Sequence, residues 1–343
     1  MIKQRFMGRT GLKVSELCLG TLNFGWKTDE KTAFAILDAY HAAGGNFIQA
    51  THQSLDLYLP SAAVAASEEI VGRWWKERGL RREDLFLATR IHVHSHGASA
   101  ESDWSTRLRE LCRRSLERLQ TDYVDLVIFD WTDSFAPLAG PLAAFDQVVR
   151  GGLARYVGAG NFPTWRVVES LGRAYVSNYC RFEALQADYS LITRARFELE
   201  AMGLCQEQRL GFFARSPLAG GYLTRRFDLE TMLRTGRRDW LLERYGNSYG
   251  DAALGAATDV ASRHDVSPAQ ISLAWVLHNP AVTSAVIGVR SVVQLDEMIH
   301  ASSLALSAED LERLDHATAA EEIRLAPELP RSEEPRRAAA IFA

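Results

Sequence analysis

The sequence has few of the features typical of secreted proteins, of proteins stabilised by a bound metal, or of membrane-spanning proteins. Its 343 residues include only four cysteines, none in the C-x-x-C spacing typical of a metal or redox site. No apolar run reaches the roughly 20 residues that a membrane helix needs, and the N-terminus has no apolar signal segment. The net charge of −4 gives no strong field for nucleic acid or an anionic membrane. These absences predict a cytoplasmic protein with reduced thiols and without a nucleic-acid or membrane partner.

What the chain does have is the composition of an ordinary globular protein. Hydrophobic residues make up 47% of it and charged residues 24%. At this length a hydrophobic core forms without help from disulfides or metal. The length suits one large α/β barrel or two smaller domains.

Strand and helix patterns alternate along most of the chain. A hairpin pattern with a turn at Arg9-Thr10-Gly11 covers 4–16, and eight apolar runs typical of buried strands follow. The strand patterns cover 16–20, 46–49, 85–89, 124–129, 154–159, 184–187, 211–214 and 285–287. The helical patterns cover 29–43, 67–78, 102–119, 141–150, a segment beginning near Pro163, 193–208, 268–278 and 291–302. Eight such units without a break predict an α/β fold, a closed (β/α)8 TIM barrel with an N-terminal hairpin.

Two segments fall outside this alternation. Residues 222–250 are rich in Arg, Gly, Tyr and Asn and predict a long excursion after the seventh strand, of the kind that is usually functional or mobile. Residues 319–343 carry three prolines among charges and indicate a tail that covers the barrel or stays disordered. We therefore predict a barrel domain over 1–318 and a C-terminal tail over 319–343.

Seven short motifs, in a fixed order, resemble the aldo-keto reductase superfamily over about 4–318. They include Gly-Arg-Thr-Gly-Leu-Lys-Val-Ser near the N-terminus and Gly-Gly-Asn-Phe-Ile in the second strand. The motifs lie at 8–15, 19–21, 44–48, 67–68, 158–162, 216–221 and 287–291. The resemblance implies a TIM barrel of aldo-keto reductase type that binds NADP(H) across the C-terminal barrel face and reduces a carbonyl or sugar-like small molecule.

The same resemblance implies that all four catalytic positions are substituted. The family has a tetrad of Asp, Tyr, Lys and His, and the matching positions here hold Gln49, Ser54, Arg90 and Asp130. A serine hydroxyl is far too weak an acid to replace the tyrosine, and a guanidinium does not readily release a proton. Ordinary carbonyl reduction is therefore not expected.

Arg90 and Asp130 end adjacent predicted strands, where barrel active sites are built. Since Gln49 is neutral, we expect Asp130 to supply the counter-charge of Arg90, so that the two form an ion pair in the barrel mouth. Asp130 is then either an acid or base in catalysis or a group that only fills a dead site.

Other polar and aromatic residues follow the strands at the same face. His52 and Tyr58 come after the second strand and are candidate acids, and His92 comes after the third and is a candidate substrate contact. The alternating histidines that begin at His92 would share one face if they lay on a strand, as a metal site needs. A loop is expected there instead, so no metal is predicted. Trp26 and Trp131 are expected to wall a substrate pocket, although Trp131 could equally be core.

The resemblance also assigns the cofactor contacts one by one. Asn161 and Gln186 match the amides that hold the nicotinamide carboxamide, although the serine that often precedes the asparagine is here Gly160. Arg215 matches a residue that packs on the nicotinamide face. The loop that binds the pyrophosphate is matched by Ser216, Leu218 and Gly220. Arg290 matches the arginine that binds the adenosine 2′-phosphate, and Gln294 matches the adenine contact.

Three functional hypotheses follow for this scaffold. The first is an NADP(H)-dependent oxidoreductase with a non-standard acid/base set. The second is a redox-silent enzyme, such as a dehydratase, lyase, cyclase or epimerase. The third is a non-catalytic relative that binds a ligand. The oligomeric state is not readable from the sequence.

Overall fold

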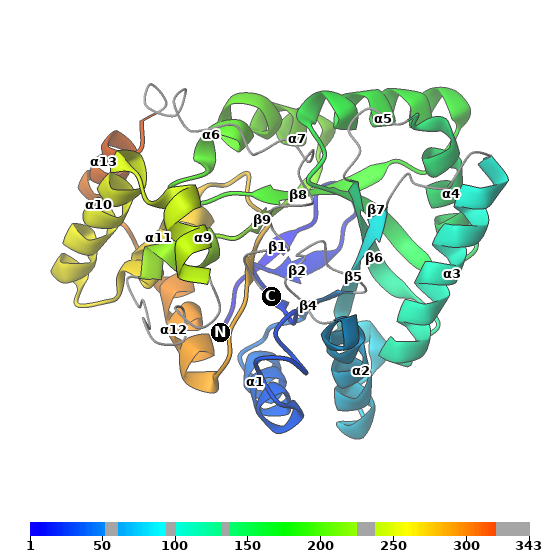
Figure 1. The fold of residues 1–343 in the computed structure, drawn as a ribbon, viewed down its shortest axis with the longest axis horizontal. Coiled ribbons are helices and arrows are strands. Elements are labelled where there is room, and N and C mark those ends of the chain that lie inside the picture. Colours follow the sequence, from blue (N-terminus) through cyan, green and yellow to red (C-terminus); the bar gives the residue numbers. More distant parts are fainter. Residues whose placement is uncertain (52–60, 94–100, 132–136, 225–236, 320–343) are drawn as a thin grey trace.

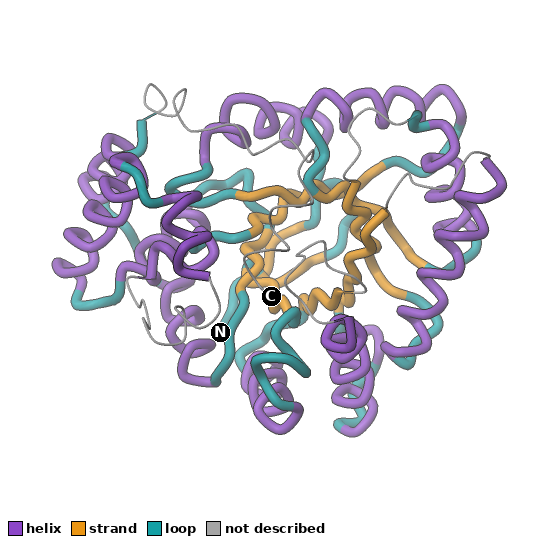
Figure 2. Tube along the Cα trace, in the orientation of Figure 1, coloured by secondary structure: helices purple, strands orange, loops and turns teal. Residues whose placement is uncertain are grey.

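The computed structural model describes residues 1–51, 61–93, 101–131, 137–224 and 237–319. Strands lie at the centre of the molecule and helices surround them (Figure 1, Figure 2). No helix among these residues is long and apolar enough to cross a membrane. The tail predicted over 319–343 lies almost wholly outside the described residues, so the division into domain and tail stays a prediction.

The barrel has eight parallel strands, and each pairs with the next until the last pairs with the first. This order confirms the predicted (β/α)8 fold. The strands are β3 (Leu17–Gly20), β4 (Phe47–Thr51), β5 (Phe86–Val93), β6 (Val124–Trp131), β7 (Ala154–Gly160), β8 (Phe182–Asp188), β9 (Gly211–Arg215) and β10 (Ser284–Ile287).

The predicted N-terminal hairpin is also present. Strands β1 (Gln4–Phe6) and β2 (Lys13–Ser15) pair antiparallel, apart from the barrel. Met7 and Val14 are fully buried and pack in one cluster with residues of the barrel interior. The hairpin thereby closes one end of the barrel, and the opposite end is left for the site.

Helices cover the outside of the barrel. Asp29 caps the first of them as predicted, because its side chain accepts a hydrogen bond from the N–H of Thr32 at 2.8 Å. The longer helices are α1 (Glu30–Ala42), α2 (Ser61–Glu77), α3 (Glu101–Leu119), α4 (Ala139–Arg150), α5 (Thr164–Ser177), α7 (Met202–Gln208), α9 (Arg237–Tyr245), α10 (Ser248–His264), α11 (Pro268–His278), α12 (Val292–Ser303) and α13 (Ala308–Ala317). Short segments are η1 (Arg82–Asp84), α6 (Arg194–Arg196), η2 (Phe197–Ala201) and η3 (Ala219–Thr224).

The structure corrects several predicted boundaries. The helix expected over 193–208 is interrupted by the π-turn η2, and the excursion predicted over 222–250 contains α9 and the first residues of α10. The sequence analysis identified neither α9 and α10 nor α13 as helices. Strand β5 continues to Val93, four residues beyond the prediction, because its extra residues pair with β6.

The barrel interior changes from apolar to polar along the strands. Side chains alternate between the two faces of a strand, so every second residue points inward. An apolar layer that includes Phe47, Ala88 and Ile128 fills the interior. One inward step further along the same three strands come Gln49, Arg90 and Asp130. The strand period therefore places these three polar side chains directly above the apolar layer.

Candidate active site

Arg90 and Asp130 form an ion pair across neighbouring strands. Nη2 of Arg90 contacts Oδ2 of Asp130, and the two side chains are only 14% and 4% exposed. The contact predicted from the sequence is confirmed. Nε of Arg90 is buried and has no hydrogen-bond partner within the part of the chain that the structure describes. An unsatisfied buried donor of this kind suits an oxygen of a bound molecule.

Asp130 has further polar neighbours. Its Oδ1 accepts a hydrogen bond from Nδ2 of Asn161 at 3.1 Å, and Nδ1 of His92 lies 3.6 Å from its Oδ2. Burial would raise the pKa of Asp130, but Arg90, His92 and Arg215 outweigh burial and lower the pKa to about 2. At neutral pH the carboxylate is therefore ionised and has no proton to donate.

Gly160 makes room for this carboxylate. A Cβ atom at Gly160 would lie 2.5 Å from Oδ1 of Asp130 and 3.0 Å from Cγ2 of Ile128. Any residue with a side chain, including the serine often found at this position in the resembling family, would displace Asp130 from its observed place. The departures at positions 130 and 160 thus fit one another sterically.

Gln49 and Gln186 bind each other from strands that are not neighbours. Nε2 of Gln186 donates to Oε1 of Gln49 at 2.6 Å, and Nε2 of Gln49 lies 3.4 Å from Oε1 of Gln186. Both side chains are buried. Gln186, which was predicted to hold the nicotinamide carboxamide, is therefore engaged by Gln49.

A second ion-pair group at the barrel mouth was not identified from the sequence. Nε of Arg215 donates to Oδ1 of Asp188 at 2.8 Å, and Nη2 of Arg244 lies 3.4 Å from Oδ2 of Asp188. Burial would raise the pKa of Asp188, but the three arginines Arg215, Arg244 and Arg90 outweigh burial and lower it. The spacing of two residues from Gln186 could have pointed to Asp188, whereas Arg244 comes from α9, a helix without a predicted pattern.

The loop after β9 has the backbone of an anion-binding turn. Four of its residues, Ser216, Ala219, Gly220 and Gly221, have positive φ values of 51°, 48°, 66° and 106°. The N–H of Gly221 donates to the carbonyl of Leu218 at 2.9 Å, which keeps the turn tight. Turns of this kind can form an anion-binding concavity from backbone N–H groups, although the N–H groups of Ala219 and Gly221 here donate within the loop.

Arg290 lies at the start of α12 with its guanidinium unengaged. The N–H of Arg290 donates to Oε1 of Gln294 at 2.8 Å, and Ser291 caps the helix by accepting from the N–H of Gln294 at 3.2 Å. The side chain of Arg290 is exposed and makes no hydrogen bond or ion pair with the described residues. Met298, where the family has an asparagine, is buried in the core and so contributes packing.

These residues together fit a nicotinamide dinucleotide. Asn161 and Gln186 lie side by side, since the N–H of Asn161 donates to the carbonyl of Gln186 at 2.9 Å. Asn161 uses only one side-chain N–H on Asp130, so its Oδ1 and second N–H are left for a carboxamide. The positive-φ loop and Arg290 provide for the phosphates.

The other candidates have different outcomes. His52, Ser54 and Tyr58 lie outside the described residues, as does the side chain of Trp131, whose backbone ends β6. Trp26 is partly buried, with Nζ of Lys27 4.0 Å from the centre of its ring.

The loop expected at His92 is wrong. His92 is a buried strand residue, paired in register with Asp130 in the extended part of β5. Among the residues with a described placement, no cluster of three or more His, Cys, Asp or Glu could hold a metal ion.

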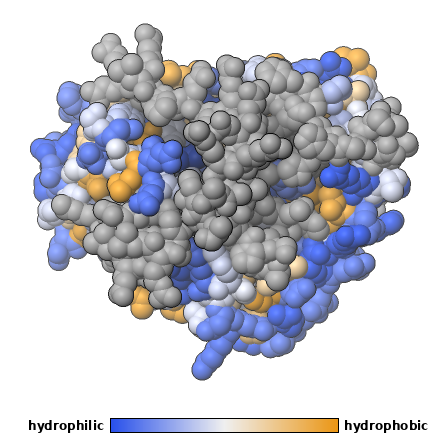
Figure 3. All heavy atoms as spheres, viewed as in Figure 1, coloured by the Kyte–Doolittle hydropathy of each residue, from blue (hydrophilic) through white to orange (hydrophobic). Residues whose placement is uncertain are grey.

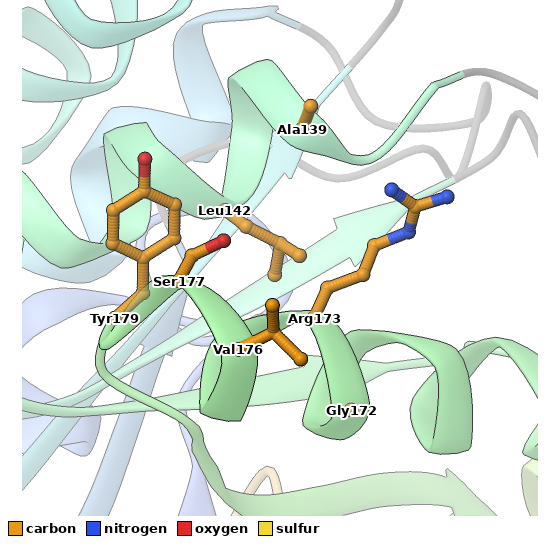
Figure 4. Close-up of a pocket in the computed structure, with 7 residues that line it drawn as sticks. All are labelled: Ala139, Leu142, Gly172, Arg173, Val176, Ser177 and Tyr179. Atoms are coloured by element: carbon orange, nitrogen blue, oxygen red, sulfur yellow. The ribbon is translucent and has the colours of Figure 1, made fainter.

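The structure also has a hollow that does not belong to the barrel mouth. It lies outside the barrel between α4 and α5, and all its lining residues come from these helices and the turn that follows α5 (Figure 4). The lining residues are Ala139, Leu142, Gly172, Arg173, Val176, Ser177 and Tyr179.

Comparison with known proteins agrees with this geometry. Residues 16–319 match the family described as the aldo/keto reductase family. An uncharacterized oxidoreductase of Bacillus subtilis, YrpG, is 35% identical over 319 residues, which cover 90% of this chain and 94% of that protein. Protein tas of Escherichia coli is 31% identical, with coverage of 89% and 94%. Norsolorinic acid reductase of Aspergillus flavus is 28% identical, with coverage of 90% and 78%. The chain therefore belongs to the aldo/keto reductase family.

Proposed function

We propose that this protein is an NADP(H)-binding oxidoreductase of aldo-keto reductase type that acts on a small carbonyl or sugar-like compound with a non-standard acid/base set. The observation that carries the proposal is the exposed guanidinium of Arg290 at the start of α12, which makes no hydrogen bond or ion pair with the described residues, together with the positive-φ loop after β9. The names of two relatives, an oxidoreductase and a reductase, support redox chemistry.

Each of these residues binds a different part of the dinucleotide. Arg290 provides a bidentate fork for the doubly charged 2′-phosphate, and the backbone of Ser216 to Gly221 receives the pyrophosphate. Asn161 orients the nicotinamide through its carboxamide. When bound, the dinucleotide supplies or accepts a hydride at the barrel mouth.

Arg90 and His92 provide the polar chemistry toward the substrate. The buried Nε–H of Arg90 donates to the substrate carbonyl oxygen and orients it. Asp130 is ionised, so it pairs with Arg90 and lies beside Nδ1 of His92 but does not donate a proton. His92 is then the described side chain suited to deliver the proton to that oxygen, since histidine is the usual acid near neutral pH.

Titration of the protein with NADPH, NADP+ and NADH, followed by fluorescence, tests the proposal. We expect saturable binding that is tighter for NADPH than for NADH. If none of the three dinucleotides binds, the proposal fails, and a redox-silent enzyme or a non-catalytic ligand binder takes its place. If NADPH binds and His92→Gln leaves its affinity unchanged but slows turnover by about 10²–10⁴, the assignment of His92 as the acid is supported. Unchanged turnover in His92→Gln would reject that assignment and leave His52 and Tyr58.

A further inference from the structure

The outer side of α5 exposes large hydrophobic side chains. Trp165, Val168, Tyr175 and Val176 are 52%, 51%, 89% and 84% exposed, and they are four of the nine large hydrophobic side chains that are exposed among the described residues. They recur at helical spacing, while Val167 and other residues of α5 are buried on its opposite side. We call these four residues the α5 face. Hydrophobic atoms show at the upper right of the surface, over the end of α5 (Figure 3).

The hollow between α4 and α5 lies beside one end of this face. Its volume is about 290 Å³, and Leu142, Val176 and Tyr179 give it apolar walls (Figure 4). Gly172 lies on the same side of the helix, between Trp165 and Val176, and a Cβ atom there would meet nothing within 4 Å. The middle of α5 is therefore open to close approach by another backbone.

We propose that the α5 face binds the same face of a second copy, with the two helices antiparallel about a twofold axis beside Gly172. A helix rises 1.5 Å per residue, so Trp165 lies roughly 10 Å before Gly172, and Val176, on the wall of the hollow, lies roughly 6 Å after it. In the antiparallel pair, Trp165 of each copy lies opposite the hollow of the other. A twofold interface needs this kind of self-complementary surface.

The charges beside the α5 face are self-complementary as well. Glu169 and Arg173 lie on one flank of the face, before and after Gly172, and form an ion pair within the chain at 2.8 Å. In the antiparallel pair, Glu169 of each copy comes next to Arg173 of the other, so opposite charges meet on the flank of the interface. This match selects a second copy of the chain over a partner of unrelated sequence.

The proposed interface is separate from the reaction centre. Helix α5 lies on the outside of the barrel, and it carries none of the residues that meet at the mouth. Both mouths stay accessible in the dimer. The outcome of the dimer experiment is therefore independent of whether the protein binds NADP(H).

Sedimentation equilibrium of the full chain over the micromolar range tests the dimer. We expect a mass twice that of the 38.3 kDa chain. Val176→Glu should weaken dimerisation at least about 100-fold, because the dimer would bury an unpaired charge. Val293→Glu is the matched control, since Val293 is 74% exposed on α12, away from this face. A monomer at all concentrations, or a dimer that Val176→Glu leaves intact, would overturn the proposal.

Cross-linking tests the position of the axis. Under mild oxidation Gly172→Cys should give a disulfide-linked dimer, because the two substituted positions lie beside the axis and close to each other. Gly203→Cys on α7, where a Cβ also meets nothing within 4 Å, should stay unlinked, as should the parent chain. A dimer in solution that Gly172→Cys fails to link would reject this interface even if Val176→Glu did not fold.

Discussion

The cofactor arc and the reaction centre are built on different physical principles. In the arc, formed by the loop after β9 and the start of α12, backbone conformation prepares the site and Arg290 stays unengaged. In the reaction centre, the side chains bind one another: Asp130 holds Arg90 and Asn161, and Gln49 holds Gln186. A site built from backbone conformation depends little on neighbouring side chains. In a network of side chains that bind one another, the effect of replacing one member depends on the others.

The fit between Gly160 and Asp130 shows such dependence. A Cβ at position 160 would meet the carboxylate at 2.5 Å, so Asp130 occupies its place only beside a glycine. The two positions therefore constrain each other, and a side chain at position 160 would require Asp130 to move.

The largest expected effect concerns ordinary reductase activity. Generic aldehyde reduction with NADPH should be about 10²–10⁴-fold slower than in relatives with an intact tetrad, because no strong acid stands at the tyrosine position. Spectrophotometric assay of NADPH oxidation with a simple aromatic aldehyde measures this. Brisk turnover would contradict the comparison and would direct attention to Tyr58 or His52 as the acid.

Asp130→Asn tests whether the reaction centre is held together by its charges. The substitution leaves the guanidinium of Arg90 mostly buried and unpaired, so it should lower the free energy of unfolding by about 3–5 kcal/mol. Chemical denaturation measures this. Asp84→Asn is a control, since Asp84 pairs with Arg81 at an exposed position and should cost less than about 1 kcal/mol. Loss of turnover without loss of stability would instead make Asp130 an acid or base.

The same substitution has a pH signature. The folded-state pKa of Asp130, about 2, lies below its ordinary value of 3.8. The carboxylate therefore contributes stability above about pH 4, and this contribution is lost as the pH falls toward 2. The difference in unfolding free energy between the parent and Asp130→Asn should shrink over that range. A difference that stays constant down to pH 2 would mean that the ion pair does not cause it.

Gly160→Ala tests the steric match between positions 160 and 130. The added methyl group should lower the free energy of unfolding by about 1–3 kcal/mol, as overpacking does. The cost should be smaller when Asp130→Ala is also present, because that change removes the carboxylate. Additive costs in this double-mutant cycle would show that the two positions are independent. Gly255→Ala, in open space on α10, should cause no loss.

Arg290→Ala tests the cofactor arc, with an expected effect no larger than that of Gly160→Ala. The variant should lose about 1–3 kcal/mol of NADPH binding, the contribution of a charge-assisted hydrogen bond, and should barely change NADH binding. Fluorescence titration of both dinucleotides measures this, with NADH as the internal control. An equal loss for both would mean that Arg290 does not bind the 2′-phosphate.

Much of the arrangement could be predicted because it follows from local sequence. The period of two along each strand and the alternation of strands with helices gave the barrel and put Arg90 and Asp130 at the ends of neighbouring strands. Arg290 was assigned through the resemblance of its motif to the family, and the structure adds that the next residue, Ser291, caps α12. The period of two along β8 could also have pointed to Asp188, two residues after Gln186. Arg244 could not be predicted in this way, because it reaches Asp188 from a segment that showed no strand or helix pattern.

The sequence by itself determined the fold and the ion pair of Arg90 and Asp130, because these depend on periodicity and on which strands are neighbours. The loop after β9 and Arg290 were assigned only through the resemblance to the family. The tertiary structure alone decided which groups engage each other inside the mouth. Gln49 and Gln186 are 137 residues apart and meet only because the barrel closes. Gly160 gives its space to Asp130 only because β6 and β7 pair in that register. A closed barrel brings distant strand ends within hydrogen-bond distance, and no local pattern records which side chain will meet which.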